Sequence, residues 1–399
     1  MRKILITLLT ASVSILSMAQ NMTNAPTSMF GIGELATGDG GQFSGMGGIS
    51  IALRADNFIN SSNPAGLTAL AARRYVVDAG VMLSYDSYTE LGTTNTSVTG
   101  NLNNFGIGCR IIPRWCAALS FTPVSSVGYA ITQEEPVQGT IGYINSLYEG
   151  QGGLSKISIN NGILITPRLS VGVNFSYVSG TIKYTETQGT ATEQYSSFKY
   201  AVYSDFGLQY HLPIGTDRSL VVGAVYGYSQ KLVQDNDLYV YSSSSGEEVD
   251  RDWKKVKQYM PQYTGAGVAY NTLRSIISAE YKYVNWSRMG SDRSSIKFRN
   301  QHLIKAGMSH AVGNIYKNPV RVMGGIGYQN SYMVISGNNA NNYHISAGLG
   351  FTIRNTHALS VGIKYRDQFN VPYNRPHERG FSAYLNISFS ERTYRGKLQ

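Results

Sequence analysis

Histidine is the first residue type to examine for chemistry, because imidazole binds metals and transfers protons near neutral pH. The chain has six: His211, His302, His310, His344, His357 and His377. None forms a ligand pair with Cys, Asp or Glu at the spacing of a metal site. The G-x-S-x-G, Walker and H-E-x-x-H motifs are also missing from the sequence. We therefore expect no metal, no cofactor and no enzymatic activity; a catalytic group assembled from distant strands is the weakest alternative.

Other polar side chains lie in segments where apolar residues alternate with small or polar ones. In Leu169–Tyr177 the odd positions are Leu, Val, Val, Phe and Tyr, and the even positions are Ser, Gly, Asn and Ser. A period of two indicates a β-strand with one apolar face and one polar face. Six polar residues fall on the polar faces of such strands: Asn174, Glu280, Lys282, Lys364, Arg366 and Asn386. We expect them to line an interior, either as a polar channel or, by preference, paired with one another or with the N-terminal segment.

The turns between these segments are short at one end and long at the other. Short turns fall at 111–115, 165–169, 213–218, 271–274, 313–319 and 354–357. Longer polar connections fall near 87–99, 124–156, 183–195, 233–257, 289–297, 333–341 and 370–378. This cycle predicts fourteen antiparallel strands, each of about the 9–11 residues that cross a bilayer. The pattern is typical of an all-β outer-membrane barrel; a large soluble β-sandwich is the alternative.

The composition agrees with a barrel wall that faces lipid. Only 15% of the 399 residues are charged, and there are 43 Gly and 29 Tyr. About half of each strand would face lipid, where Lys or Arg at mid-depth costs about 2–4 kcal/mol. Six tyrosines at strand ends suit an interfacial girdle: Tyr85, Tyr177, Tyr228, Tyr283, Tyr328 and Tyr365. The formal charge of +10 is spread along the chain, which favours membrane lipids over nucleic acid as partners.

The N-terminus has the three parts of a secretory signal peptide. Arg2 and Lys3 precede an apolar stretch from Ile4 to Leu16, and small residues end at Ala19. We expect cleavage after residue 19 and export to the outer membrane. The expected organisation is a signal peptide at 1–19, an N-terminal segment at 20–73, the barrel at 74–391 and a C-terminal tail at 392–399.

The two cysteines test the strand register around the first short turn. With three loop residues at 112–114, positions of equal parity face the same way across the hairpin. Cys109 would then face lipid and Cys116 the interior. Their Cβ atoms would diverge, so we expect no disulfide.

Residues 20–73 lack the strand rhythm and are rich in Gly, Ala and Asn. They contain Phe30-Gly-Ile-Gly-Glu-Leu35, Met46-Gly-Gly48 and, just before the first strand, Asn63-Pro64-Ala65-Gly66-Leu67. With Tyr148-Glu-Gly-Gln-Gly-Gly-Leu154, this segment resembles the FadL-like outer-membrane family of hydrophobic-compound transporters, in a branch found in the Bacteroidetes. The resemblance is sharpest over about fifty N-terminal residues and is architectural over the barrel.

The resemblance implies a fourteen-stranded barrel whose N-terminal hatch plugs the lumen. It implies passive uptake of a small hydrophobic ligand, with hatch rearrangement and a lateral exit at a kinked third strand. Asn63, Pro64, Ala65, Gly66 and Leu67 map onto the hatch motif, and a turn that launches the first strand is their structural alternative. Pro123, at the expected end of strand three, is the candidate kink, and ordinary strand termination is its alternative.

A second function is implied by the same resemblance. FadL-like barrels also act as fixed subunits of outer-membrane protein-secretion or barrel-assembly complexes, with other outer-membrane proteins as partners. The connection at 124–156 carries several large apolar residues, including Tyr129, Ile131, Tyr143 and Tyr148. It would suit either an entrance for hydrophobic compounds or a docking surface, so both functions stay open at this point.

Overall fold

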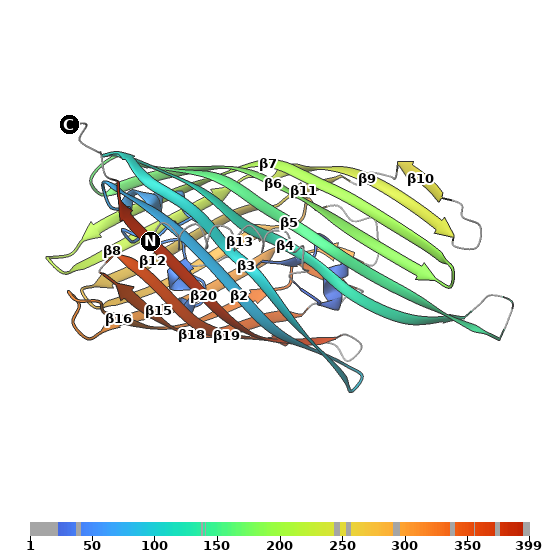
Figure 1. Cartoon of the computed structure of the whole chain (residues 1–399). Helices are drawn as coiled ribbons and strands as arrows, with labels where there is room; N and C mark the ends of the chain where they lie inside the picture. The colour runs from blue at the N-terminus through green and yellow to red at the C-terminus, as the bar shows by residue number, and fades with distance from the viewer. Residues whose placement is uncertain are drawn as a thin grey trace, which may run out of the picture.

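The computed structural model describes residues 23–36, 41–136, 139, 141–242, 248–252, 257–289, 296–335, 340–354, 356–371 and 376–393. These residues form a closed antiparallel β-barrel (Figure 1). The expected signal peptide lies outside the described residues, as does the C-terminal tail beyond residue 393. In the described ranges, no helix is long and apolar enough to cross a membrane.

Fourteen strands build the wall, as predicted, and pairing of the first with the last closes it. In wall order they are β2 (Arg74–Glu90), β3 (Thr93–Ile112), β4 (Trp115–Pro136), β5 (Tyr143–Leu164), β6 (Leu169–Gln188), β7 (Ala191–Pro213), β8 (Arg218–Gly227) with its continuation β9 (Gln230–Ser242), β12 (Gln262–Thr272) with β11 (Gln258–Met260), β13 (Ser275–Asn285), β15 (Gln301–Val312), β16 (Val320–Asn330), β18 (Asn341–Ile353), β19 (His357–Phe369) and β20 (His377–Arg392). The short β10 (Glu248–Asp252) pairs antiparallel with the end of β9, and β14 (Ile296–Phe298) pairs with β17 (Met333–Ile335).

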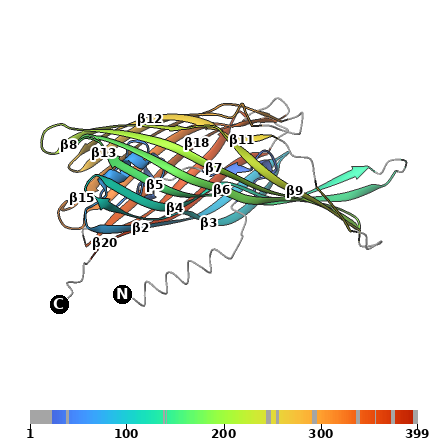
Figure 2. The same ribbon diagram turned by 90° about the horizontal axis from the view of Figure 1, so that it is seen from above.

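All six predicted short turns join adjacent strands at one end of the barrel. Several of the long connections were wrongly predicted as loops. Only residues 91–92 separate β2 from β3, only 189–190 separate β6 from β7, and β4 runs through Pro123 to Pro136. The polar stretches continue as strands because Thr and Tyr favour extended backbone and pair across the hairpin. Strands β4 to β7 and β9 therefore project well beyond the rest of the wall (Figure 2).

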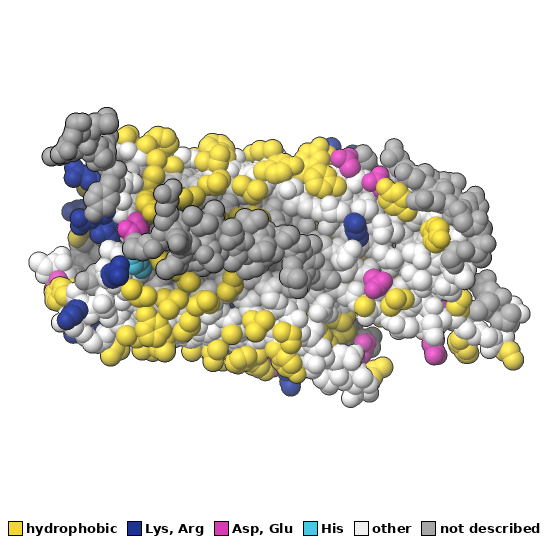
Figure 3. Space-filling model, viewed as in Figure 1, with side chains coloured by type: hydrophobic (Ala, Val, Ile, Leu, Met, Phe, Trp, Pro, Cys, Tyr) yellow, Lys and Arg dark blue, Asp and Glu magenta, His cyan; other side chains and the backbone are white. Residues whose placement is uncertain are grey.

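The outer surface carries a belt of exposed apolar side chains (Figure 3). Ile157 is 50% exposed and Ile326 is 59% exposed, on nearly opposite parts of the wall. Tyr85, Tyr177 and Tyr365 are exposed, as a girdle requires. Tyr228 was wrongly placed: it follows β8 at the interruption before β9, and its ring stacks on the buried Tyr203 at 6.1 Å.

The cysteines lie on opposite faces of the β3–β4 hairpin. Cys109 is opposite Ala117, and Cys116 is opposite Arg110. Cys116 is completely buried, in a cluster with Leu67 and Leu70, whereas Cys109 is only half-buried. Both thiols are free, as the register predicts.

The N-terminal segment lies inside the barrel (Figures 1 and 2). Its regular parts are the 3-10 turns η1 (Pro26–Met29), η2 (Gly41–Met46) and η3 (Pro64–Ala69) and the short strand β1 (Glu34–Leu35). η2 packs against β15, β16, β18, β19 and β20, and η3 against β4 to β7. The segment's larger apolar side chains, such as Leu53 and Phe58, are buried.

Wall glycines allow the backbone of this segment to approach the strands. A Cβ atom on Gly325 would lie 2.2 Å from the nitrogen of Gly47, and one on Gly307 would lie 2.2 Å from the oxygen of Met46. Four further inward glycines, on β5 to β8, make similar contacts: Gly162, Gly172, Gly207 and Gly223. The small lumen-facing residues of the strand pattern thus provide the space that the segment fills.

Two adjacent glycines in β16 test this packing. A Cβ atom on Gly324 would meet nothing within 4 Å. We expect Gly325→Val to lower the free energy of unfolding by about 1–3 kcal/mol, the usual cost of overpacking, or to expel the segment. Gly324→Val should have little effect. Denaturant titration of the heat-modifiable folded band would measure both, and equal losses would contradict the packing argument.

Candidate functional site

A cavity of about 300 Å³ lies between the N-terminal segment and the wall. Much of its lining is apolar or aromatic, from Val178, Tyr203, Met260, Val284, Trp286 and Leu303. Ligand sites are usually apolar cavities of this size or larger with a few polar groups. The cavity can therefore hold one small, mostly apolar molecule.

The charged side chains that line the cavity are mainly basic. It includes Lys156, Lys282, Lys305 and Lys364, with Glu280 as the carboxylate. Lys305 lies 3.5 Å from Glu280, and the Lys282 ammonium lies 3.8 Å from the centre of the Tyr263 ring. A cation over an aromatic face is attracted by the ring quadrupole. Within the described ranges, no three His, Cys, Asp or Glu side chains are placed to hold a metal ion.

The wall is broken beside this cavity. β3 and β4 are paired only from Phe105 opposite Phe121 down to the turn. Farther from this turn, β3 is paired with β2 and β4 is paired with β5, but no pairing joins β3 to β4. The cavity lining includes residues from both edges of this break: Asn103 and Asn104 on β3, and Thr122, Pro123 and Val124 on β4.

Both strands are irregular at the level of the break. The register of β4 with β5 shifts between Pro123 and Ser125, and that of β3 with β2 shifts at Asn103. Proline cannot donate a ladder hydrogen bond, which explains an irregularity at this position. Pro123 therefore lies inside β4 at a bulge, and the expectation that it ends the strand was wrong.

The N-terminal segment covers part of the free edge of β4. In β1, Glu34 pairs with Ser126 and Leu35 with Ser125, and the amide of Ala36 donates to the oxygen of Val124 at 3.0 Å. Just above, the Ser28 hydroxyl is 3.1 Å from the Gly128 oxygen and accepts from the Gly128 amide. Residues 28–36 thus occupy hydrogen-bonding positions that a neighbouring strand would otherwise fill.

The five residues of the hatch motif lie together in the interior. Asn63 caps η3, where its side chain accepts from the Ala65 amide and donates to the Ile51 oxygen at 2.7 Å. Pro64 is the first residue of η3, a position that requires no amide donor. Asn63, Pro64, Ala65, Gly66 and Leu67 are all buried. Their contacts hold the shape of the segment before it enters β2.

The six residues expected in the interior all lie on inward faces. Asn174 donates to the Ser61 oxygen at 3.0 Å, and Asn386 donates to the Ser44 hydroxyl at 3.1 Å. Glu280 accepts from the amides of Ser50 and Ile51, at 2.8 and 2.9 Å. Lys282 and Lys364 line the cavity. The structure brings Glu280, Lys282 and Lys364 to one cavity, while Asn174 and Asn386 bind other parts of the segment.

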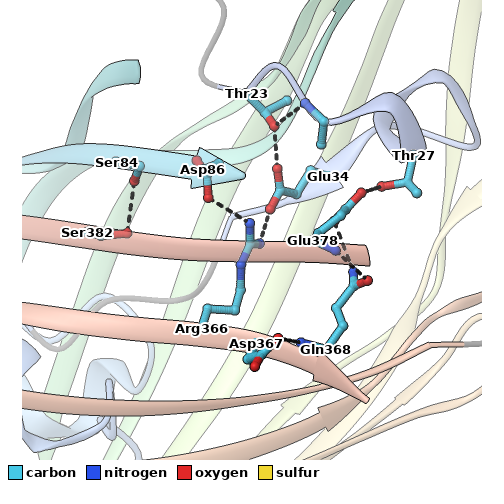
Figure 4. Close-up of polar contacts among 11 residues, drawn as sticks. Thr23, Thr27, Glu34, Ser84, Asp86, Arg366, Asp367, Gln368, Glu378 and Ser382 are labelled. Carbon is cyan, nitrogen blue, oxygen red and sulfur yellow. Dashed lines mark hydrogen bonds and ion pairs between the residues drawn. The ribbon is translucent and has the colours of Figure 1, made fainter. Parts of the chain in front are cut away.

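Arg366 lies in a separate charged cluster at the start of the segment (Figure 4). Its guanidinium pairs with Glu34 of β1 and with Asp86 of β2, at 3.2 Å in the second case. Burial alone would raise the pKa of Glu34, but Arg366 and the Thr23 hydroxyl hold that pKa below its usual value. In the same cluster Thr27 donates to Glu378 of β20. Arg366 therefore fastens the segment to two wall strands beside the break.

Sequence reasoning missed Lys305 and Glu34. Lys305 is directly opposite Glu280 in the β13–β15 ladder, but the irregular connection between these strands hides the register. Glu34 is an isolated carboxylate in a glycine-rich stretch. This stretch has no alternation of apolar and polar residues from which the direction of the Glu34 side chain could be inferred. The aromatic lining was also missed, because Trp286 and Tyr263 come from positions without a recognisable motif.

The bonds of Glu280 to the segment lead to a test. Glu280→Gln removes a buried charge that accepts from two amides and pairs with Lys305. Loss of one partner of a buried pair typically costs about 3–5 kcal/mol. We expect faster amide hydrogen exchange at residues 47–53 while the barrel strands stay protected. Glu90→Gln, at an exposed carboxylate, is the control; unchanged exchange in Glu280→Gln would refute the anchoring role.

Solved structures with a similar fold include toluene transporters and a monoaromatic hydrocarbon channel. The Pseudomonas putida toluene transporter TodX matches with 14% identity and a TM-score of 0.62, covering 91% of this chain and 100% of that chain. The Ralstonia pickettii toluene transporter TbuX matches with 12% identity and a TM-score of 0.60, covering 90% and 99%. A Pseudomonas aeruginosa FadL homologue matches with 13% identity and a TM-score of 0.59, covering 90% and 98%. At these identities the likeness establishes a shared fold alone.

No curated protein matches the sequence. The solved structures support the resemblance to FadL-like barrels at the level of the fold, and the Bacteroidetes branch stays a prediction.

The family that the sequence matches has a name other than FadL. A family model described as BamG matches residues 1–396, almost the whole sequence, and the chain therefore belongs to the BamG family.

Proposed function

We propose that this chain is an outer-membrane channel for the passive uptake of small hydrophobic compounds, with the N-terminal segment as its hatch. The observation that carries the proposal is the cavity, which reaches from buried aromatic residues to the break between β3 and β4. A molecule in this cavity would have a lateral exit at Pro123 that avoids the turn end of the barrel.

The outer surface supports the membrane location. Exposed apolar side chains surround the wall, as the lipid-facing band of an outer-membrane barrel requires. The hydrocarbon transporters that share the fold support the same location. Export through a signal peptide at 1–19 is part of this proposal.

The projecting strands provide an entrance. Val127, Tyr129 and Ile182 form a buried cluster with Ile131, Tyr148 and Tyr184 packed against it. The adjoining cluster contains Leu154 and Val178, with Val124 packed against it. Val124 and Val178 also line the cavity, so the two clusters mark the apolar route that we propose from the extension to the cavity. Met29 of the hatch packs against the first cluster.

The chemistry of the route favours an apolar compound of modest size. Aromatic and aliphatic side chains dominate the clusters along it. Transfer of such a compound from water is favourable by about 25 cal/mol per Å² of apolar surface. A cavity of about 300 Å³ excludes a long folded chain unless the hatch moves.

A disulfide across the β1–β4 pair would test the lateral exit. Leu35 and Ser125 are direct antiparallel partners, within the Cα separation that a disulfide accepts. In a background with Cys109→Ala and Cys116→Ala, we expect oxidised Leu35→Cys/Ser125→Cys to lose uptake of labelled toluene into proteoliposomes, and reductant to restore it. The two single variants are controls. Full uptake by the oxidised protein would exclude an exit that needs this edge to open.

A second function has its own supporting observation. The hairpin of β4 and β5 extends past the wall and presents Tyr143 at 71% exposure and Ile141, in the connection between the strands, fully exposed. Exposed apolar groups at the tip of a rigid hairpin suit contact with another protein. A fixed subunit of an outer-membrane protein-secretion or barrel-assembly complex is therefore the alternative.

Shortening this hairpin would separate the two functions. Ile131 is opposite Tyr148 in the ladder, so Asn-Gly can replace residues 132–147 as a two-residue turn. We expect uptake to fall in proteoliposomes if the hairpin guides compounds. Preserved uptake with loss of a stoichiometric partner in affinity purification from native membranes would support the subunit role instead.

A further inference from the structure

The six short turns all lie at one end of the barrel, and each bears a basic residue. The six basic residues are Arg114, Arg168, Arg218, Arg274, Lys317 and Arg354, which we call the turn ring. All six side chains are exposed. Figure 3 shows Lys and Arg side chains gathered at this end of the molecule, beside the apolar belt.

Each member of the turn ring has a large apolar neighbour that is also exposed. Arg114 lies between Ile112, which is 55% exposed, and Trp115, which is 38% exposed. The corresponding neighbours in the other five turns are Ile165, Ile214, Leu273, Tyr316 and Ile353. An apolar group beside a cation suits the boundary between hydrocarbon and headgroups, where each part meets a matching environment.

The charges of the ring are largely uncompensated. In the part of the chain that the structure describes, no ion pair joins any of the six to a carboxylate. Arg73 and Arg392 add further exposed cations where the barrel closes. Exposed carboxylates such as Glu90, Glu134, Glu149 and Glu193 lie on the extensions at the opposite end. Asp217 beside Arg218 is an exposed carboxylate at the turn end, where cations predominate, whereas exposed cations such as Lys231 and Lys257 accompany the carboxylates away from the turns. The turn end is therefore the more positive one.

We propose that the turn ring binds the anionic headgroups of phospholipids in the leaflet next to the turns. Arginine forms strong, often bidentate hydrogen bonds to phosphate, and a basic residue near a membrane surface attracts anionic lipid. Phospholipids surround the barrel, and with one cation in each turn every turn can bind one lipid headgroup. The inference rests on the proposed membrane location and is independent of what the barrel transports.

Lipid retention by the full chain tests the ring. The protein in detergent would be mixed with equal amounts of phosphatidylglycerol and phosphatidylethanolamine, and bound lipids would be counted by native mass spectrometry. The test variant is Arg114→Gln/Arg168→Gln/Arg218→Gln/Arg354→Gln. Arg274 is left unchanged because it also donates to the oxygens of Ala311 and Gly313 in the neighbouring turn.

A variant of equal charge loss at the other end is the control. Lys231, Lys257, Lys297 and Arg299 are exposed and lie away from the turns, so their replacement by Gln removes the same charge. We expect the native chain and this control to prefer phosphatidylglycerol by roughly fivefold per site, the equivalent of about 1 kcal/mol per basic residue. The ring variant should bind the two lipids almost equally.

Two outcomes would overturn the proposal. In the first, the ring variant keeps the lipid preference, and loss of an acidic protein partner from this variant would then assign the surface to a protein. In the second, both variants lose the preference equally, which would assign the effect to net charge. A native chain that failed to give a heat-modifiable band in vesicles of either lipid would instead refute the membrane location itself.

Discussion

The structure depends on hydrogen bonding of an irregular backbone that is enclosed by a barrel. A buried carbonyl or amide without a partner costs free energy comparable to a lost hydrogen bond, and the N-terminal segment has too few regular turns to satisfy its own groups. The wall supplies partners instead. Gln209 donates to the oxygen of Ile51, Lys305 to that of Gly48 and Ser388 to that of Asn57. These bonds explain why lumen faces that could line an open channel carry amides, hydroxyls and paired charges.

The same constraint shapes the break in the wall. A free strand edge presents unpaired backbone groups, and the segment covers this edge only at residues 28–36. The covering contact is small compared with the ladders between wall strands, and it is held by the ion pairs of Arg366. The edge of β4 is therefore a point at which the wall could open with little loss of strand pairing.

Much of the barrel could be predicted because a strand exposed to two environments repeats with a period of two. Adjacent residues such as Phe175 and Asn174 can be assigned to opposite faces of the strand from the sequence alone, before the neighbouring strands are known. The polar extensions were missed because parts of them, such as residues 93–96, are exposed on both faces, so alternation of apolar and polar residues is not required there. The position of Pro123 inside β4 was missed because proline marks an irregularity equally well at a bulge and at a strand end.

The sequence by itself determined the strand number, the short turns, the opposite faces of Cys109 and Cys116, and the inward direction of Glu280 and Arg366. Each of these follows from local period or from position next to a turn. Only the tertiary structure decided which side chains meet: Glu280 with the amides of Ser50 and Ile51, Arg366 with Glu34, and β1 with the edge of β4. These contacts join residues between 90 and 332 positions apart, and their geometry is set by barrel closure, which no local pattern encodes.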